Sequence, residues 1–497
     1  MKINIADSVK KTDIAFLSLY KGEKLSGKIK KVLGSKLTAV VSARFKAKDF
    51  EGDEGQVLTL YLEGAFCKKL CLLGLGDKKE QMPRVLENLG GKMAGLAKQV
   101  KAKSAVVLMG EKSFGNGEMQ EVAEGFVLGA YEFVKYKKKD PKAVALKDLI
   151  FVASGKLAGK GKEVKSLVAD LKIFKESSAL TRDLINLSAN ELTPKTFAEK
   201  AKAVAKELKI KVTVLDEKKL EQLGCGGILG VGRGAEFPPK MVILEYKGAK
   251  AGKQPDIAFV GKGVTFDSGG LNLKPTKYIE TMKQDMGGAA TVLGAMQAIA
   301  KAKLPGYFVG VLVLAENAVS DKAIHPGDVL KAYNGKTIEV GNTDAEGRLI
   351  LADALSYTEK KLKPKVMVDI ATLTGAVSVA LGYCITGIMG NDQKLVDKVL
   401  KFAKEAGERM WQLPLDADFV KATKGDFTDL NNISNGMRAG SSMGGAFLHN
   451  FVEDTAWVHF DIGGTAFVEK PNSTTKYGAT GVALRTFVKL AKNAGEL

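Results

Sequence analysis

The sequence predicts an α/β protein in which a smaller N-terminal α/β domain is joined by a helix to a larger C-terminal α/β domain with a mixed central sheet. Short runs rich in Val, Ile and Leu alternate with amphipathic helical stretches, as in sheets covered by helices. The length of 497 residues also exceeds the roughly 250–300 residues at which a single core stops growing. We therefore expect an N-terminal domain over residues 1–165, a linker helix over 166–185 and a C-terminal domain over 186–497.

In the first 165 residues, β-rich runs alternate with helical patterns. Apolar residues at three- and four-residue intervals predict helices over Gly90–Lys103 and Met119–Val134. The Gly- and Lys-rich stretch Ser154–Lys162 predicts a surface connection, and a long helix is expected from about Glu163 to Ile185. We predict strands at Thr38–Ser42, Val57–Leu62, Lys69–Leu73, Ser104–Met109 and Leu149–Ala153.

The alternation resumes in the C-terminal part. Thr193 and Pro194 mark a helix start, because Thr is a favoured N-cap and Pro suits the first helical position. That helix is expected to run to about Leu208, and later ones cover Glu217–Leu223, Ala289–Ala302 and Gly347–Lys361. Strands are predicted at Val212–Leu215, Met241–Tyr246, Ile257–Gly261, Tyr307–Leu314, Thr337–Val340 and Val366–Ile370.

Two features argue against common nucleotide sites. The glycine run Gly230–Gly234 lacks the GxGxxG spacing and leads into Phe-Pro-Pro rather than a helix, so we predict a structural turn there. The sequence also contains no GxxxxGK[ST] loop.

The net charge of +19 lies almost entirely in the first half. Residues 1–261 hold 48 Lys and Arg against 31 Asp and Glu, with basic clusters at 135–139 and 156–165. Such asymmetry is compatible with nucleic-acid binding. A lysine-rich solvated surface is the favoured interpretation, because the clusters lack interleaved aromatics and a recognised binding motif.

Histidine and cysteine are too scarce for most metal and nucleophile sites. The chain has three His and four Cys, with no zinc-finger, HExxH or Cys–His spacing. Any metal must therefore be held mainly by carboxylate oxygens, which suits Mg²⁺, Mn²⁺ or Zn²⁺. The first residues resemble no secretory signal and no apolar run is long enough to span a bilayer, so a cytoplasmic protein without membrane contact is expected.

Residues 342–349, NTDAEGRL, concentrate Asp344, Glu346 and Arg348 before an apolar helix start. Two further acids, Asp267 and Asp285, follow the strand that ends before Lys262. If the strands that precede these segments are neighbours, the four carboxylates converge at one rim of the sheet and repel one another unless cations neutralise them. Two divalent ions would do so.

A plainer interpretation remains open for each acid. Asp285 and Glu346 stand at predicted helix starts, where acidic side chains are favoured without any metal.

Three segments carry a specific resemblance: 260–275 (VGKGVTFDSGGLNLKP), 282–290 (MKQDMGGAA) and 342–349 (NTDAEGRL). They resemble the signature blocks of the leucyl aminopeptidase family of dimetal peptidases. The similarity continues through 369–376, 457–465 and 478–485.

This resemblance implies two divalent ions, Mn²⁺ or Zn²⁺, bound by Lys262, Asp267, Asp285, Asp344 and Glu346. In it, Asp267 and Glu346 bridge the ions, Lys262 and Asp285 complete one site, and Asp344 completes the other.

The resemblance also assigns roles outside the ligand set. Lys274 stabilises the oxyanion, Arg348 holds a bicarbonate that acts as general base, and Met282 lies in the pocket for the first side chain. The implied activity is removal of the N-terminal residue, preferably leucine or another apolar one, from peptides with a free N-terminus. The implied assembly is a cytoplasmic homohexamer.

Some positions depart from the family pattern. Ala318 and Val319 stand where Met-Pro is expected, and His325 where arginine is common, which puts side-chain preference in question. Two other classes stay open: a regulatory protein that binds nucleic acid through the basic half, and a two-metal phosphoesterase.

Overall fold

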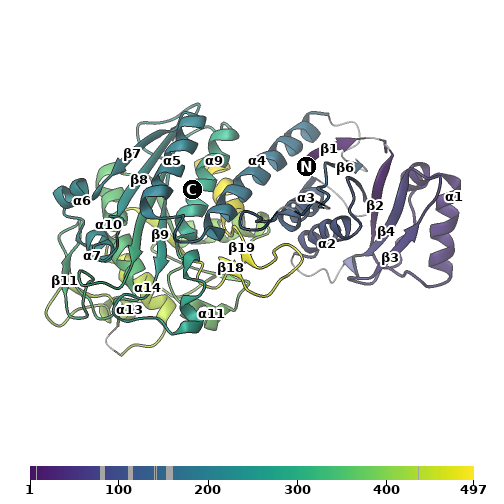
Figure 1. Cartoon of the computed structure of the whole chain (residues 1–497). Coiled ribbons are helices and arrows are strands. Elements are labelled where there is room, and N and C mark those ends of the chain that lie inside the picture. The colour runs from purple at the N-terminus through teal and green to yellow at the C-terminus, as the bar shows by residue number, and fades with distance from the viewer. Residues whose placement is uncertain are drawn as a thin grey trace. The chain divides into compact units, whose positions relative to one another are not determined.

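The computed structural model describes residues 1–6, 8–9, 11–78, 84–109, 116–138, 140–141, 143–152, 161–434 and 436–497. The chain divides into two compact units (Figure 1), Met1–Glu176 with Lys470–Lys476, and Ser177–Glu469 with Tyr477–Leu497. The division falls inside helix α4 (Gly161–Asn186), which contains the expected linker helix. Most of the predicted connection 154–162 lies outside the described residues, as do Lys139 and residues 156–160 of the basic clusters.

The smaller unit is built on a six-stranded sheet in the order β1-β6-β5-β2-β4-β3. All neighbours are parallel except β3, which runs antiparallel to β4. The strands are β1 (Lys2–Ala6), β2 (Thr12–Leu19), β3 (Val57–Tyr61), β4 (Cys67–Gly74), β5 (Ser104–Met109) and β6 (Asp148–Val152). The helices are α1 (Gly27–Lys46), α2 (Val85–Gln99), α3 (Asn116–Ala130) and the first part of α4.

Helices cover both faces of this sheet. Along β2, Ile14 and Phe16 join the core under α2, α3 and α4, whereas Ala15 and Leu17 join the core under α1. The two-residue period of a strand explains why one run feeds both cores.

The strand predicted at Thr38–Ser42 is wrong, because these residues lie in α1. Its buried residues Ile29, Leu33, Leu37 and Val41 recur at four-residue intervals, so the helical period prevailed over a short β-branched run. This 20-residue helix contains six basic residues and no acidic one.

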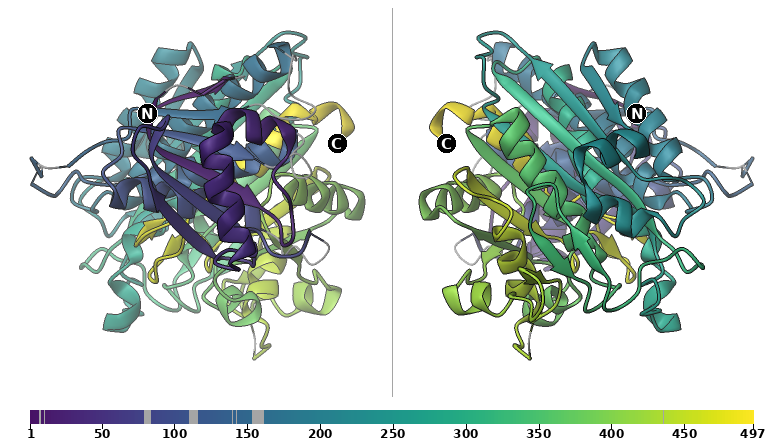
Figure 2. Two further views of the ribbon diagram at one scale, coloured as in Figure 1. Left: turned by 90° about the vertical axis from the view of Figure 1, so that its right-hand side faces the viewer. Right: turned by 90° about the vertical axis from the view of Figure 1, so that its left-hand side faces the viewer.

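The larger unit is built on an eight-stranded mixed sheet in the order β15-β14-β17-β13-β9-β10-β8-β7. Its central strands β17, β13, β9 and β10 are parallel. The right-hand view of Figure 2 shows the long strands of this sheet in teal and green. The strands are β7 (Lys211–Leu215), β8 (Lys240–Lys247), β9 (Ile257–Asp267), β10 (Tyr307–Asn317), β13 (Val366–Ala371), β14 (Thr386–Gly390), β15 (Met410–Gln412) and β17 (Ala456–Asp461).

Two layers of helices bury this sheet. One core packs β9 and β10 against α7, α10 and α14, and the other face is covered by α5, α9, α12 and α15. Phe487 of α15 stacks on Phe259 of β9 with ring centroids 4.7 Å apart. These helices are α5 (Pro194–Leu208), α7 (Gly226–Gly232), α9 (Gly287–Lys301), α10 (Glu346–Tyr357), α12 (Gln393–Glu405), α14 (Gly440–His449) and α15 (Leu484–Lys492).

Shorter elements complete the larger unit. β11, β12 and β16 form a separate three-stranded sheet, and β18 pairs with β19. The shorter helices and strands of this unit are α6 (Glu217–Leu223), α8 (Thr276–Ile279), η3 (Met282–Gln284), β11 (Val329–Lys331), β12 (Thr337–Glu339), η4 (Thr358–Leu362), α11 (Ala376–Leu381), α13 (Ala417–Lys421), β16 (Leu430–Asn431), β18 (Phe467–Val468), β19 (Gly478–Ala479) and η5 (Ala494–Glu496).

The predicted fold class is confirmed: both units are α/β, and the larger one has a mixed central sheet. The turn predicted at Gly230–Gly234 is wrong in part, because α7 extends through Gly232. A Cβ at Gly232 would lie 2.6 Å from the Pro239 ring, so close packing explains that glycine better than a turn does. Among the described residues, no helix is long and apolar enough to cross a membrane.

Asp353 of α10 links three segments of the larger unit. Its fully buried carboxylate accepts hydrogen bonds from the backbone N–H groups of Ile228 at 2.8 Å and Tyr333 at 2.7 Å. Burial raises the pKa of Asp353 to about 7, although these N–H groups favour the charged form. The proton is thus held more tightly in the folded chain than in the unfolded chain, where the pKa is about 3.9.

We predict that Asp353→Asn destabilises the larger unit by roughly 1–3 kcal/mol, because an amide can accept at only one of the two positions. The penalty is largest near pH 4.5. As pH rises toward 7, the wild type alone loses the stability contributed by its raised pKa, so the penalty shrinks. Urea unfolding of both proteins between pH 4.5 and 8 tests this, and a penalty that does not change with pH would contradict it.

Candidate metal centre

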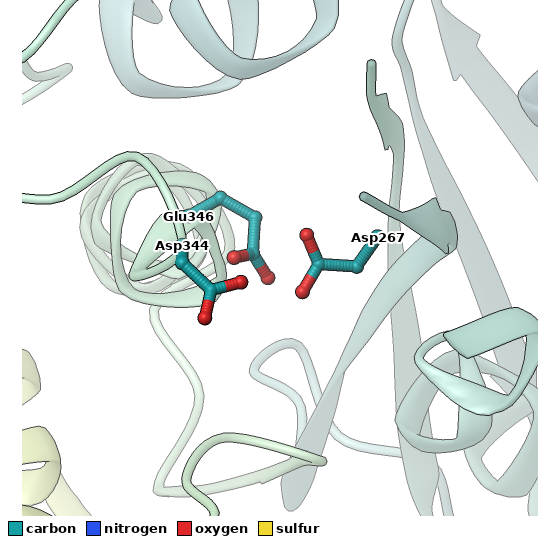
Figure 3. Close-up of side chains that lie close together, drawn as sticks. All are labelled: Asp267, Asp344 and Glu346. Atoms are coloured by element: carbon teal, nitrogen blue, oxygen red, sulfur yellow. The ribbon is translucent and has the colours of Figure 1, made fainter. Parts of the chain in front are cut away.

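The predicted site residues meet at the carboxyl ends of the central strands. Lys262 and Asp267 belong to β9, and Asp285 follows η3 just before α9. Asp344 and Glu346 lie at the start of α10. In Figure 3 the carboxylates of Asp267, Asp344 and Glu346 point toward one another, with one oxygen of each within 4.8 Å of the others.

Two lysines hold the acids together. The Nζ atom of Lys262 lies 2.8 Å from Oδ2 of Asp285 and 2.7 Å from Oε1 of Glu346. The Nζ atom of Lys274 lies 2.8 Å from Oδ2 of Asp267 and 2.5 Å from Oδ1 of Asp344. Four carboxylates thus share two ammonium groups, and Lys262, Asp267, Asp285 and Glu346 are each at most 4% exposed.

The oxygens that face the lysines make few other bonds. Oδ2 of Asp285, Oδ1 of Asp344 and Oε1 of Glu346 are buried and accept no hydrogen bond of regular geometry from the described residues. Buried carboxylate oxygens are normally hydrogen-bonded or bound to a metal. This donor set, four carboxylates and an amine, fits a centre for hard or borderline divalent ions.

The electrostatics of the cluster reflect this surplus of acid. Burial alone would lower the pKa of Lys262, but the charges of Asp285 and Glu346 outweigh it and raise the pKa well above its usual range. The pKa of Lys274 is raised in the same way, chiefly by Asp267. Burial, followed by repulsion from Asp267, raises the pKa of Asp344 and of Glu346. Without metal ions, both lysines are therefore protonated and the acids resist full ionisation.

Two glycines leave the space in which Lys262 and helix α9 pack against their neighbours. A Cβ at Gly347 would lie 2.8 Å from both Cε and Nζ of Lys262, so only glycine leaves room for that lysine across the start of α10. A Cβ at Gly288 would lie 2.1 Å from the carbonyl oxygen of Ile370. Because glycine has no Cβ, α9 and the adjacent Asp285 can pack closely on the strand ends.

The loop after β13 fixes one side of the cluster. The Thr372 hydroxyl donates to Oδ1 of Asp285 at 2.6 Å, and its carbonyl accepts from Nζ of Lys262 at 2.9 Å. Buried Asp461 holds the following residue pair by accepting from the N–H groups of Leu373 and Thr374 at 3.2 and 3.3 Å. Thr372 lies in the segment 369–376 that resembles the family, but nothing in the sequence marks it as a contact of Lys262 and Asp285.

Arg348 lies in the first turn of α10. Its Nη1 donates to the carbonyl of Asn432 at 2.6 Å, and its buried Nε has no hydrogen-bond partner among the described residues. Burial lowers the pKa of this guanidinium, against the attraction of Asp461 and Glu346, yet an arginine stays charged. A partly buried cation with an unused, buried donor is suited to holding an anion.

Other expected positions lie in segments that adjoin Asp285 and Asn317 along the chain. Met282 begins η3, three residues before Asp285, and is partly buried. The three departures, Ala318, Val319 and His325, lie in the segment after β10, where Val319 and His325 are exposed.

One premise of the predicted convergence is wrong. The strand before the NTDAEGRL segment, β12, belongs to the separate three-stranded sheet and is not a neighbour of β9. The segment instead reaches Asp267 through loop contacts: the N–H of Thr343 donates to Oδ1 of Asn272 at 2.8 Å, and its hydroxyl donates to the carbonyl of Gly269 at 2.6 Å.

Acids and lysines gathered at the ends of parallel strands are typical of a metal-dependent hydrolase. The model for the cytosol aminopeptidase family matches this chain, with the catalytic domain over residues 179–488 and the N-terminal domain over 16–140. The chain belongs to the cytosol aminopeptidase family. It is a metal-dependent aminopeptidase, a metallo-exopeptidase, and the resemblance to the leucyl aminopeptidase family is confirmed.

Similar proteins cover nearly the whole chain. A probable cytosol aminopeptidase of Protochlamydia amoebophila is 37% identical over 490 residues, 97% of this chain and 96% of that protein. One of Azotobacter vinelandii is 38% identical over 477 residues, 95% of this chain and 94% of that protein. The structure of the bottromycin maturation enzyme BotP in complex with Mn has a TM-score of 0.82 and 30% identity, and covers 97% of this chain and 99% of that chain.

We predict that Lys262→Met destabilises the larger unit when the protein has been treated with a chelator. Its free energy of unfolding should fall by about 3–5 kcal/mol at pH 7.5, because Asp285 and Glu346 lose their shared cation. Lys202→Met, at an exposed ion pair with Glu199, is the matched control and should have little effect. Denaturant unfolding in EDTA measures both. Equal stability of Lys262→Met and wild type would show that the acids do not depend on this lysine.

Proposed function

We propose that the chain removes the N-terminal residue of peptides with two divalent ions held by Lys262, Asp267, Asp285, Asp344 and Glu346. Asp267 and Glu346 would hold both ions, Lys262 and Asp285 would complete one site, and Asp344 would complete the other. The observation that carries the proposal is the set of buried carboxylate oxygens that meet only lysine ammonium groups. When bound, two such ions supply Lewis-acid chemistry, lower the pKa of a water and bind the free amine of the substrate.

Lys274 and Arg348 supply positive charge beside the ions. Carboxylates raise the pKa of Lys274, so it stays protonated and can stabilise the negative charge that develops on the scissile carbonyl oxygen. Arg348 would hold a bicarbonate, which would supply a general base, and its unused Nε and planar fork suit that anion.

The side-chain preference, the identity of the metal ions, the location and the assembly are also part of the proposal. Met282 lines the pocket for the first side chain, with leucine or another apolar residue preferred. Mn²⁺ or Zn²⁺ are the proposed ions, and the similarity to BotP, whose structure is in complex with Mn, supports the first. A cytoplasmic location is supported by the names of the curated relatives. The homohexamer stays a prediction from the family resemblance.

Nucleic-acid binding stays a second hypothesis that rests on charge alone. The basic residues of the N-terminal half would carry it, and six of them lie on α1. A nucleic-acid binder has no need of the buried lysine–carboxylate centre, and for that reason we favour the hydrolase. The same centre, with its lysine ligand, also disfavours a two-metal phosphoesterase.

We predict that Glu346→Ala abolishes hydrolysis of leucine p-nitroanilide, because a bridging ligand is lost. Lys274→Ala should lower kcat by roughly 10²–10³-fold and keep metal binding, because only charge stabilisation is removed. Lys277→Ala, at an exposed position three residues away, is the control. The assay uses chelated protein with Mn²⁺ or Zn²⁺ restored, and undiminished turnover by Glu346→Ala would overturn the ligand assignment.

We predict that the apparent affinity for Mn²⁺ increases with pH. Lys262 has a raised pKa in the metal-free site and must lose its proton to become a ligand, so the ammonium form competes with the ion more strongly as pH falls. Calorimetric titration at pH 7.0 and 8.5, in two buffers of different ionisation enthalpy, should register at least about one proton released per protein. An affinity independent of pH and buffer would argue against Lys262 as a ligand.

A further inference from the structure

We propose that Asn317 is a positioning residue that fixes which oxygen of Asp267 is available to a metal and joins Asp267 to the segment carrying Asp344 and Glu346. The inference rests on the proposed function, because it assumes that Asp267 is a ligand. Asn317 is the last residue of β10, is 2% exposed, and carries no charge.

The side chain of Asn317 bridges two ligand segments. Its Nδ2 donates to Oδ1 of Asp267 at 2.8 Å and to the carbonyl oxygen of Thr343 at 3.0 Å. Both protons of one amide are therefore used, one on the end of β9 and one on the residue before Asp344.

This arrangement leaves Asp267 with one usable oxygen. Oδ1 accepts from Asn317 and also from the backbone N–H of Gly269 at 2.9 Å. Oδ2 instead faces Nζ of Lys274 at 2.8 Å. Because two donors occupy Oδ1, Oδ2 is the oxygen directed into the cluster, and Asn317 prevents the carboxylate from rotating.

An irregularity in the strand pairing places Asn317 opposite Asp267. Ala315 pairs with Val264, and the next pair is Asn317 with Asp267, so β9 advances three residues while β10 advances two. Such bulges re-aim side chains at the ends of strands. Without the extra residue, Asn317 and Asp267 would fall out of register.

The backbone at Asn317 is anchored independently of its side chain. Its carbonyl accepts from the N–H of Ser268 at 3.0 Å and from the Ser268 hydroxyl at 2.7 Å. Thr343 is also held by Asn272 and Gly269. Removal of the Asn317 amide should therefore disturb the carboxylate of Asp267 while leaving the local backbone in place.

The test compares chelator-treated wild type with Asn317→Ala and Asn317→Leu, the second of which keeps the side-chain volume without the donor. Thr265→Val is the matched control, because it removes a hydrogen bond of 3.3 Å from Thr265 to the carbonyl of Ala315 in the same strand pair without touching Asp267. Calorimetric titration with Mn²⁺ gives the affinity, thermal unfolding in EDTA gives the stability, and leucine p-nitroanilide gives kcat and KM.

Both Asn317 variants should bind Mn²⁺ about 10–100-fold more weakly than wild type, with Thr265→Val unchanged. In saturating Mn²⁺ their kcat should fall more than their KM rises. Mn²⁺ affinities equal to wild type in both Asn317 variants would overturn the role of Asn317 but not the proposed function. An equal loss of Mn²⁺ affinity in Thr265→Val would do the same. A wild-type protein that binds no Mn²⁺ would overturn the proposed function and this inference together.

Discussion

The larger unit is organised around a surplus of buried negative charge. Four carboxylates and two lysines meet at the ends of the central strands, and the pairing distances of 2.5–2.8 Å leave no room for water between the opposite charges. Two ammonium groups cannot neutralise four carboxylates, which explains why burial and mutual repulsion raise the pKa values of Asp285, Asp344 and Glu346. The same imbalance suits the site to divalent cations.

Bringing these groups together depends on a rigid frame. The parallel strands β9, β10 and β13 are buried on both faces, so their ends are held by two hydrophobic layers rather than by the polar cluster itself. Glycines at 288 and 347 then remove the side chains that would keep α9 and α10 away from Lys262. The packing of the hydrophobic core thus offsets the cost of collecting like charges.

Uncharged side chains direct the acids within this frame. Asp285 has Oδ1 taken by the hydroxyl of Thr372, and Asp267 has Oδ1 taken by the amide of Asn317. In both residues the other oxygen, Oδ2, faces a lysine. A hydrogen bond to one oxygen of each carboxylate therefore determines what the second oxygen can bind, which is how a protein fixes the geometry of a metal ligand.

The sequence by itself determined the alternation of strands and helices, the α/β class and the acidic and basic residues of the centre. Local chemistry was sufficient for α5, because the Thr193 cap and Pro194 act within one turn, and for β9, β10 and β13, whose apolar runs are continuous. The equally buried strands β2 and β17 were not predicted. It was not sufficient for α1, where a β-branched run concealed the four-residue period, or for β12, which joined a different sheet from the one expected. Only the tertiary structure showed that Asn317 and Thr372 contact the acids, because those hydrogen bonds join residues 50 and 87 positions apart and polar uncharged side chains carry no signal of their partners.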